Sequence, residues 1–150
     1  MPTIITLNDG TLTFTLEQPI YRVLDHSDVF KIAPSRGRDL TVAGADGVLP
    51  RDRRYGPLPV TITLQVNGRW NDDGTRAADP AANCREALQD MEAFLTAPPR
   101  RYTMTVDDGF TVLTGQATFE EQGRLQFRTP SVADTSLLFT VTSGRVEESS

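Results

Sequence analysis

The sequence has few of the residues on which most catalytic and metal sites depend. Its 150 residues include one cysteine, Cys84, and one histidine, His26. A single cysteine excludes an intrachain disulfide and a thiolate metal cluster. A single histidine excludes most zinc sites and leaves a Ser–His pair without a spare base. The composition favours a function without a metal or cofactor, and we predict that the protein uses none.

The chain also lacks long apolar runs and an excess of positive charge. No run is long enough for a membrane span, and residues 1–10 lack the basic and apolar regions of a signal peptide. We therefore expect a protein that is made in a cytoplasm and does not bind membranes. The formal net charge of −5 argues against general nucleic-acid binding, which needs a basic surface.

Short alternating runs bounded by turn residues predict a mainly β chain. Asp9-Gly10 and Asp108-Gly109 each stand between two such runs, which is a strong β-hairpin signal. Apolar and polar residues alternate through residues 58–66, as in a strand with one buried face. The predicted strands are residues 3–7, 11–16, 21–24, 29–32, 40–43, 58–66, 102–106, 110–118, 124–129 and 137–142.

One segment has the period of a helix. Asp79 suits the N-cap, Pro80 suits the first helical position, and Pro98-Pro99 ends the segment. Between them, apolar residues recur at intervals of three and four, which makes one stripe that packs on a sheet. The residues of this stripe are Ala81, Cys84, Leu88, Met91 and Leu95.

The order of these elements predicts the fold class. Alternating βαβ units are absent, so we predict an antiparallel β-sandwich or flattened barrel with a flanking α-helix. We expect residues 1–150 to form a single domain. Residues 143–150 are polar and acidic, and we expect them to be a flexible tail.

Residues 33–59, which we call the arm, have no apolar period although they lie between two predicted strands. A structureless connection longer than roughly 12–15 residues is uncommon in a compact domain and is usually functional or disordered. We expect the arm to reach outside its own domain and to contact another subunit. Its candidate contact residues are Arg36, Arg38, Asp39, Asp46, Arg51, Arg53, Arg54 and Tyr55.

Arginine supplies nearly all the positive charge of the chain, because Lys31 is the only lysine. This bias reflects either a GC-rich genome or a use of arginine for planar, bidentate pairing with carboxylates.

Other patterns that could carry chemistry are weak. Residues 25–28 (DHSD) contain the residue types of a hydrolase triad, but four consecutive turn residues cannot easily adopt the geometry of a triad. Cys84 lies on the apolar stripe of the helix and is typical of a small core residue. Trp70 either covers the end of the sheet or acts as an exposed interface anchor. We therefore predict no enzymatic activity.

Four segments together resemble ring-forming virion proteins of long-tailed phages. They are residues 42–54 (VAGADGVLPRDRR), 66–68 (VNG), 85–95 (REALQDMEAFL) and the opening 7–12 (LNDGTL). Similar arrangements occur in actinobacteriophage neck and minor tail proteins and in the N-terminal ring domain of distal tail proteins. The resemblance covers roughly residues 3–142.

The resemblance implies a tail-tube-like fold that assembles as a ring, commonly a hexamer, around the DNA channel of a virion. The partners would be further copies of the chain and adjacent neck or tail rings, and DNA would pass without sequence-specific binding. Many distal tail proteins carry a second β-domain, whereas we expect a single domain here. The resemblance therefore favours a head-to-tail connector or stopper, and a distal or minor tail ring at the tail tip is the alternative. The alternative from another class is a monomeric carbohydrate- or protein-binding β-sandwich with Trp70 and Tyr55 as anchors.

Overall fold

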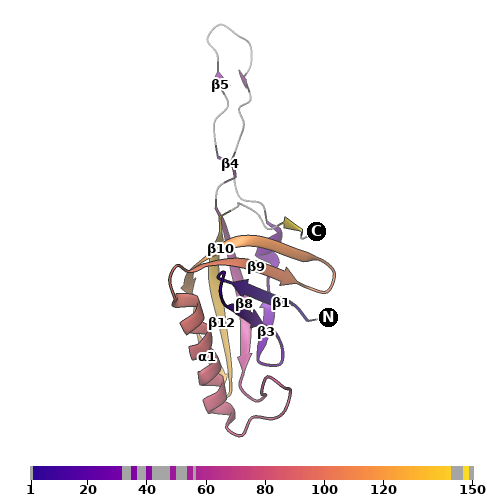
Figure 1. Cartoon of the computed structure of the whole chain (residues 1–150), viewed down its shortest axis with the longest axis vertical. Coiled ribbons are helices and arrows are strands. Elements are labelled where there is room, and N and C mark those ends of the chain that lie inside the picture. Colours follow the sequence, from indigo (N-terminus) through magenta and orange to yellow (C-terminus); the bar gives the residue numbers. More distant parts are fainter. Residues whose placement is uncertain are drawn as a thin grey trace.

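The computed structural model describes residues 2–31 and 57–142, together with five short paired segments at 35–36, 40–41, 48–49, 54–55 and 147–148. In these residues the chain is mainly β with one long helix, as the sequence predicts (Figure 1). The described part has no helix with the length and apolar character that a membrane span requires.

The main sheet is antiparallel throughout and contains nine strands. Its hydrogen-bonded path runs β2-β1-β9-β10-β12-β8-β3, with β11 paired to β12 and β13 paired to β10. The strands are β1 (Ile4–Asn8), β2 (Thr13–Leu16), β3 (Tyr21–Asp25), β8 (Leu58–Asn67), β9 (Arg101–Asp107), β10 (Val112–Gln122), β11 (Gln126–Thr129), β12 (Val132–Val141) and β13 (Glu147–Glu148).

The main sheet bends so that its two halves face each other, but it does not close into a barrel. Figure 1 shows β9 and β10 running across β8 and β12, with α1 alongside. The path ends at β2 on one side and β3 on the other, and the two end strands are not paired with each other. The register of β3 on β8 shifts between Val23 and Asp25, which marks a bulge in that end strand. The result is a flattened, open barrel or sandwich with a flanking helix.

Alternation along the strands places the core between the two halves of the sheet. Every second residue of β8 from Leu58 to Val66 is buried, and its neighbours are exposed or half-buried. The same period in β9 buries Tyr102, Met104 and Val106. These side chains belong to one continuous cluster of buried residues that also includes Phe139 of β12.

The helix α1 (Pro80–Thr96) begins where the sequence predicts. Asp79 is the N-cap, and its Oδ1 accepts a hydrogen bond of 3.2 Å from the Ala82 N–H. The buried face consists of Cys84, Ala87, Met91 and Leu95. Burial raises the pKa of the Cys84 thiol, so this residue is a protonated core side chain at neutral pH.

Two tyrosine hydroxyls of the sheet donate hydrogen bonds to backbone carbonyls of α1. Tyr21 of β3 donates to the Ala87 carbonyl at 2.8 Å. Tyr102 of β9 donates to the carbonyls of Phe94 and Leu95 at 2.8 and 3.1 Å. The Tyr102 bonds satisfy carbonyls near the C-terminal end of the helix, where no further helical N–H is available.

Residues 29–32 were predicted to be a strand, and this prediction is wrong. Residues Ser27–Phe30 form a 3-10 helix, η1, while Ile32 lies outside the described residues. The Asp25 carboxylate accepts the Ser27 N–H at 2.9 Å, and the Asp28 carbonyl accepts the Lys31 N–H at 3.1 Å. Short polar side chains that bond to nearby backbone in this way favour a turn over a strand.

Other strand boundaries also differ from the prediction by a few residues. Strand β12 begins at Val132, because its first residues pair with the end of β8. Phe110 lies in the turn before β10 and is not part of the strand. Glu147 and Glu148, in the predicted tail, pair with Thr114 and Leu113 of β10.

Candidate assembly interface

At its end the arm enters the main sheet, because Leu58 and Pro59 are the first residues of β8. Before residue 57, its described part consists of two short antiparallel pairs, one nested inside the other. The outer pair joins β4 (Ser35–Arg36) to β7 (Arg54–Tyr55), and the inner pair joins β5 (Leu40–Thr41) to β6 (Val48–Leu49). Each pair forms a sheet separate from the main one. The two limbs of the arm therefore run antiparallel to each other, whereas the sequence predicted one brief strand at residues 40–43.

The register of the outer pair places three of the candidate contact residues. Arg36 is paired with Arg54, and Ser35 is paired with Tyr55. The other candidates lie outside the described residues, so their role in a contact stays a prediction. These are Arg38, Asp39, Asp46, Arg51 and Arg53.

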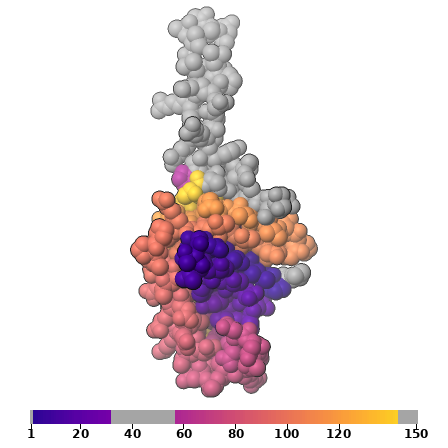
Figure 2. All heavy atoms as spheres, in the orientation of Figure 1, coloured from indigo at the N-terminus to yellow at the C-terminus, as the bar shows by residue number. Residues whose placement is uncertain are grey.

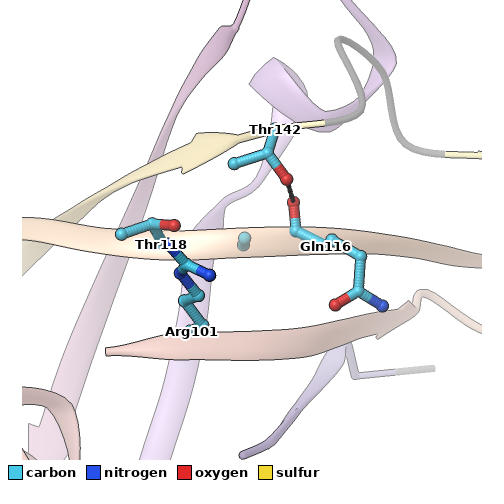
Figure 3. Close-up of a pocket in the computed structure, with 5 residues that line it drawn as sticks. Arg101, Gln116, Thr118 and Thr142 are labelled. Atoms are coloured by element: carbon cyan, nitrogen blue, oxygen red, sulfur yellow. Dashed lines mark hydrogen bonds between the residues drawn. The ribbon is translucent and has the colours of Figure 1, made fainter. Parts of the chain in front are cut away.

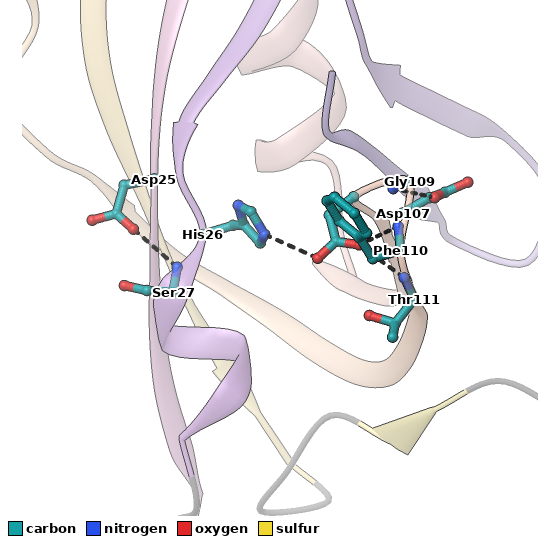
Figure 4. A network of polar contacts seen from close by, with 8 residues as sticks. Asp25, His26, Ser27, Asp107, Gly109, Phe110 and Thr111 are labelled. Carbon is teal, nitrogen blue, oxygen red and sulfur yellow. Dashed lines mark hydrogen bonds and ion pairs between the residues drawn. The ribbon is translucent and has the colours of Figure 1, made fainter. Parts of the chain in front are cut away.

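Next to the point where the arm begins, η1 lies against the β9–β10 turn (Figure 4). The Nε2 atom of His26 lies 3.8 Å from Oδ2 of Asp108. The His26 ring also contacts Phe30, with 5.9 Å between the ring centroids. We call the surface formed by Asp25, His26, Asp28, Phe30, Asp107, Asp108 and Phe110 the Asp–Phe patch.

Hydrogen bonds to the backbone hold the β9–β10 turn in one conformation. Asp107 Oδ1 accepts the Gly109 N–H, and Asp108 Oδ1 accepts the N–H groups of Phe110 and Thr111, all at 2.9 Å. The Thr111 and Phe110 N–H groups, helped by the nearby His26, hold the pKa of Asp108 below its ordinary value. The turn is therefore a rigid support for the Phe110 side chain and for a carboxylate that is ionised at neutral pH.

The same geometry does not assemble a catalytic triad from residues 25–28. The Ser27 N–H donates to Asp25, while His26 points toward Asp108 on a different hairpin. A triad needs the serine and the histidine within hydrogen-bond reach of each other. Asp25 and Ser27 instead form a local turn.

Asp28 links η1 to the main sheet. Its Oδ2 accepts the Thr61 N–H of β8 at 3.0 Å, and its Oδ1 lies 2.7 Å from the Lys31 ammonium. The hydrogen bond from Lys31, followed by that from Thr61, lowers the pKa of Asp28. A carboxyl whose pKa is lower in the folded chain stabilises the fold above its unfolded pKa, roughly 3.9, and this contribution is lost as the pH falls through the folded value.

We expect Asp28→Asn to reduce stability at neutral pH and to have little effect at an acidic pH below the folded pKa of Asp28, where the wild-type carboxyl is protonated. The amide keeps an acceptor for Thr61 but loses the charge that Lys31 contacts. Urea unfolding at both pH values measures the difference. Glu17→Gln is the control, because the Glu17 side chain makes no hydrogen bond to the described residues and should show no such pH dependence. An Asp28→Asn effect of equal size at both pH values would contradict this account.

Trp70 lies in the loop between β8 and α1. It forms an isolated β-bridge with Arg76, whose guanidinium carbon lies 5.8 Å from the centroid of the indole ring. Asn83 of α1 donates to the carbonyls of Gly68 and Trp70 at 3.0 and 2.9 Å. The half-buried indole thus packs on a residue of its own loop, and its covering of the sheet end stays a prediction. Its role as an interface anchor stays a prediction.

One hollow on the described surface lies over the strands β9 and β10 and contains no carboxylate or histidine. It has a volume of about 430 Å³ and is lined by Arg101, Gln116, Ala117, Thr118 and Thr142 (Figure 3). The side-chain amide of Gln116 donates to the Thr103 hydroxyl at 3.0 Å, and the Thr142 hydroxyl donates to the Gln116 backbone carbonyl at 3.4 Å. Among residues 2–31 and 57–142, no three His, Cys, Asp or Glu side chains group as metal ligands would.

The fold, in contrast to the sequence, has clear counterparts. No family model and no curated protein matches the chain. The Dit protein of phage SPP1, described as a paradigm of the hub adsorption apparatus in phages that infect Gram-positive bacteria, superposes with a TM-score of 0.61 over 96% of this chain. The two sequences are 12% identical.

A second match is a chain from the baseplate of phage p2 in its activated conformation, with a TM-score of 0.66 over 93% of this chain and 9% identity. In fold, the chain is similar to phage hub and baseplate proteins. It spans 51% of the SPP1 Dit chain and 44% of the p2 chain, or about half the length of each. At these identities the likeness establishes a shared fold.

Sequence reasoning missed Phe30 and Phe110 as surface residues. The sequence placed Phe30 in a predicted strand at residues 29–32 and Phe110 in one at residues 110–118. In such strands every second side chain is buried, so neither phenylalanine was expected to be an exposed turn residue. The available signal for Phe110 was its place directly after Asp107-Asp108-Gly109, because those residues shape the turn itself.

Proposed function

We propose that the protein is a structural subunit of a phage tail that assembles with further copies of itself into a ring at the hub or baseplate end. The observation that carries this proposal is the fold likeness to SPP1 Dit and to the p2 baseplate chain over more than nine-tenths of the present chain. The sequence resemblance favoured a head-to-tail connector, whereas both structural counterparts belong to an adsorption hub or a baseplate. We therefore place the ring at the tail end.

The architecture suits a scaffold role. A main sheet with one core supports the arm, whose two limbs are paired with each other at two levels. We infer that the arm contacts a neighbouring subunit or ring through its arginines, that the ring is a hexamer, and that the DNA channel passes through it. The net charge of −5 is consistent with such a conduit, since an acidic wall does not hold the DNA phosphates.

Electron microscopy of the purified full-length chain tests the proposal. We expect ring-shaped particles whose mass is a small multiple of 16.5 kDa, six copies for a hexamer. Gold-labelled antibodies against the chain should bind virions at the tail end distal to the head. A ring with label at the head–tail junction would support the connector role instead. A chain that stays monomeric at high concentration and changes its Trp70 fluorescence with a sugar would support the binding-module alternative.

A further inference from the structure

Two phenylalanine side chains of the Asp–Phe patch are exposed on rigid supports. Phe110 is 90% exposed at the tip of the hydrogen-bonded β9–β10 turn, and Phe30 is 57% exposed at the end of η1. Figure 2 shows the β9–β10 hairpin, in orange, reaching the side of the molecule. Large aromatic side chains held outward in this way are typical of the anchors that dominate protein interfaces.

The patch also carries four carboxylates. Asp25 and Asp28 lie on the η1 side, and Asp107 and Asp108 lie in the turn. Figure 4 shows Asp25 and Phe110 on opposite sides of His26. The one ammonium group in the patch, that of Lys31, is paired with Asp28. Negative charge therefore exceeds positive charge in the patch.

A surface of carboxylates and aromatic rings is complementary to arginine. The guanidinium group pairs with carboxylates through two parallel hydrogen bonds and also stacks on aromatic faces. The arm carries five arginines between residues 36 and 54. The register of its outer pair sets Arg36 opposite Arg54.

We propose that the Asp–Phe patch of one copy receives the arginine-bearing arm of a second copy. This inference rests on the proposed function and names the receiving surface for the arm. The patch immediately precedes the arm in the chain, with Phe30 five residues before Ser35 of β4. The arm and the patch are different surfaces of the chain, so a contact between them is heterologous and can repeat around a closed ring.

Cross-linking between full-length chains tests the proposal directly. One preparation carries Phe110→Cys and the other carries Arg53→Cys, and the two are mixed under mild oxidation. Native Cys84 does not interfere because it is fully buried. We expect disulfide-linked dimers that contain one chain of each kind. The control replaces Phe110→Cys with Leu12→Cys, which is 62% exposed in the β1–β2 turn, at the opposite end of β9. Its yield should be at least tenfold lower.

Sedimentation of the double variant Phe30→Ala/Phe110→Ala provides a second readout. Both side chains are exposed, so the fold should be kept, and circular dichroism checks this. We expect the dissociation constant for self-association to rise roughly tenfold or more, as for loss of aromatic anchors. Equal cross-linking at Phe110 and Leu12, or unchanged self-association of the double variant, would overturn the proposal. If wild-type rings form and persist in the double variant, the proposed function stands and only the patch inference fails. A wild-type chain that neither associates nor cross-links would refute both.

Discussion

Replacing Gly68 with alanine should lower the free energy of unfolding by about 3 kcal/mol, as expected for overpacking against backbone. A Cβ atom at this position would lie 2.2 Å from the Pro80 carbonyl oxygen, 2.4 Å from the Cys84 nitrogen and 2.6 Å from the Cys84 Cβ. Two of these are backbone atoms in the first turns of α1, so no side-chain rotation can relieve the clash. The end of β8 and the start of α1 would have to separate.

The separation would break other contacts at the same place. Asn83 donates to the Gly68 carbonyl at 3.0 Å, and the Gly68 N–H donates to the Ser131 carbonyl at 2.8 Å. Urea unfolding followed by circular dichroism measures the loss. Gly74→Ala is the matched control, because Gly74 has φ of +85° and open space around its Cβ position. Gly74→Ala should lower the free energy of unfolding only by the cost of holding alanine in a left-handed conformation, about 1 kcal/mol. Equal losses for the two variants would contradict the packing argument.

The triple variant Arg51→Ala/Arg53→Ala/Arg54→Ala should fold normally and fail to assemble. We expect its free energy of unfolding to stay within about 0.5 kcal/mol of wild type, as is usual for surface substitutions. Loss of three guanidinium groups from one contact should raise the dissociation constant of the assembly on the order of 100-fold. Sedimentation velocity over a range of concentrations measures this change, and phage particles made with the variant should lack the ring at the tail end distal to the head.

A second triple variant controls for net charge. Arg22, Arg101 and Arg124 are exposed residues of the main sheet and its turns, and replacing them with alanine removes the same formal charge. This control should assemble as wild type does. If both triple variants assemble equally well, or if both fail, the arm has no special part in the contact.

The elements that local chemistry determines were predictable from the sequence. The β1–β2 and β9–β10 hairpins follow from their Asp-Gly turns, and α1 follows from the Asp79 cap and the apolar stripe. The fold class was correct for the same reason, because these elements are long or carry clear turn residues. Each of these signals lies within about ten residues of the structure that it specifies, which is the range over which patterns are most informative.

The remaining features depend on contacts between distant residues. The η1 turn is fixed in part by the bond from the Thr61 N–H of β8 to Asp28. The first residues of β12 are strand because β8 lies beside them. The Asp–Phe patch joins residues 25–30 to residues 107–110, which only the sheet order β3-β8-β12-β10-β9 brings into contact. No local pattern in either segment specifies the other.

The two edge strands of the main sheet affect whether separate copies of the chain associate through their backbones. Strand β2 has four residues, and β3 is interrupted by its register shift between Val23 and Asp25. Short or irregular strands at such positions offer a poor template for another chain, which discourages fibrous growth. Separate copies of the chain are therefore poorly suited to associate through the backbones of these two strands.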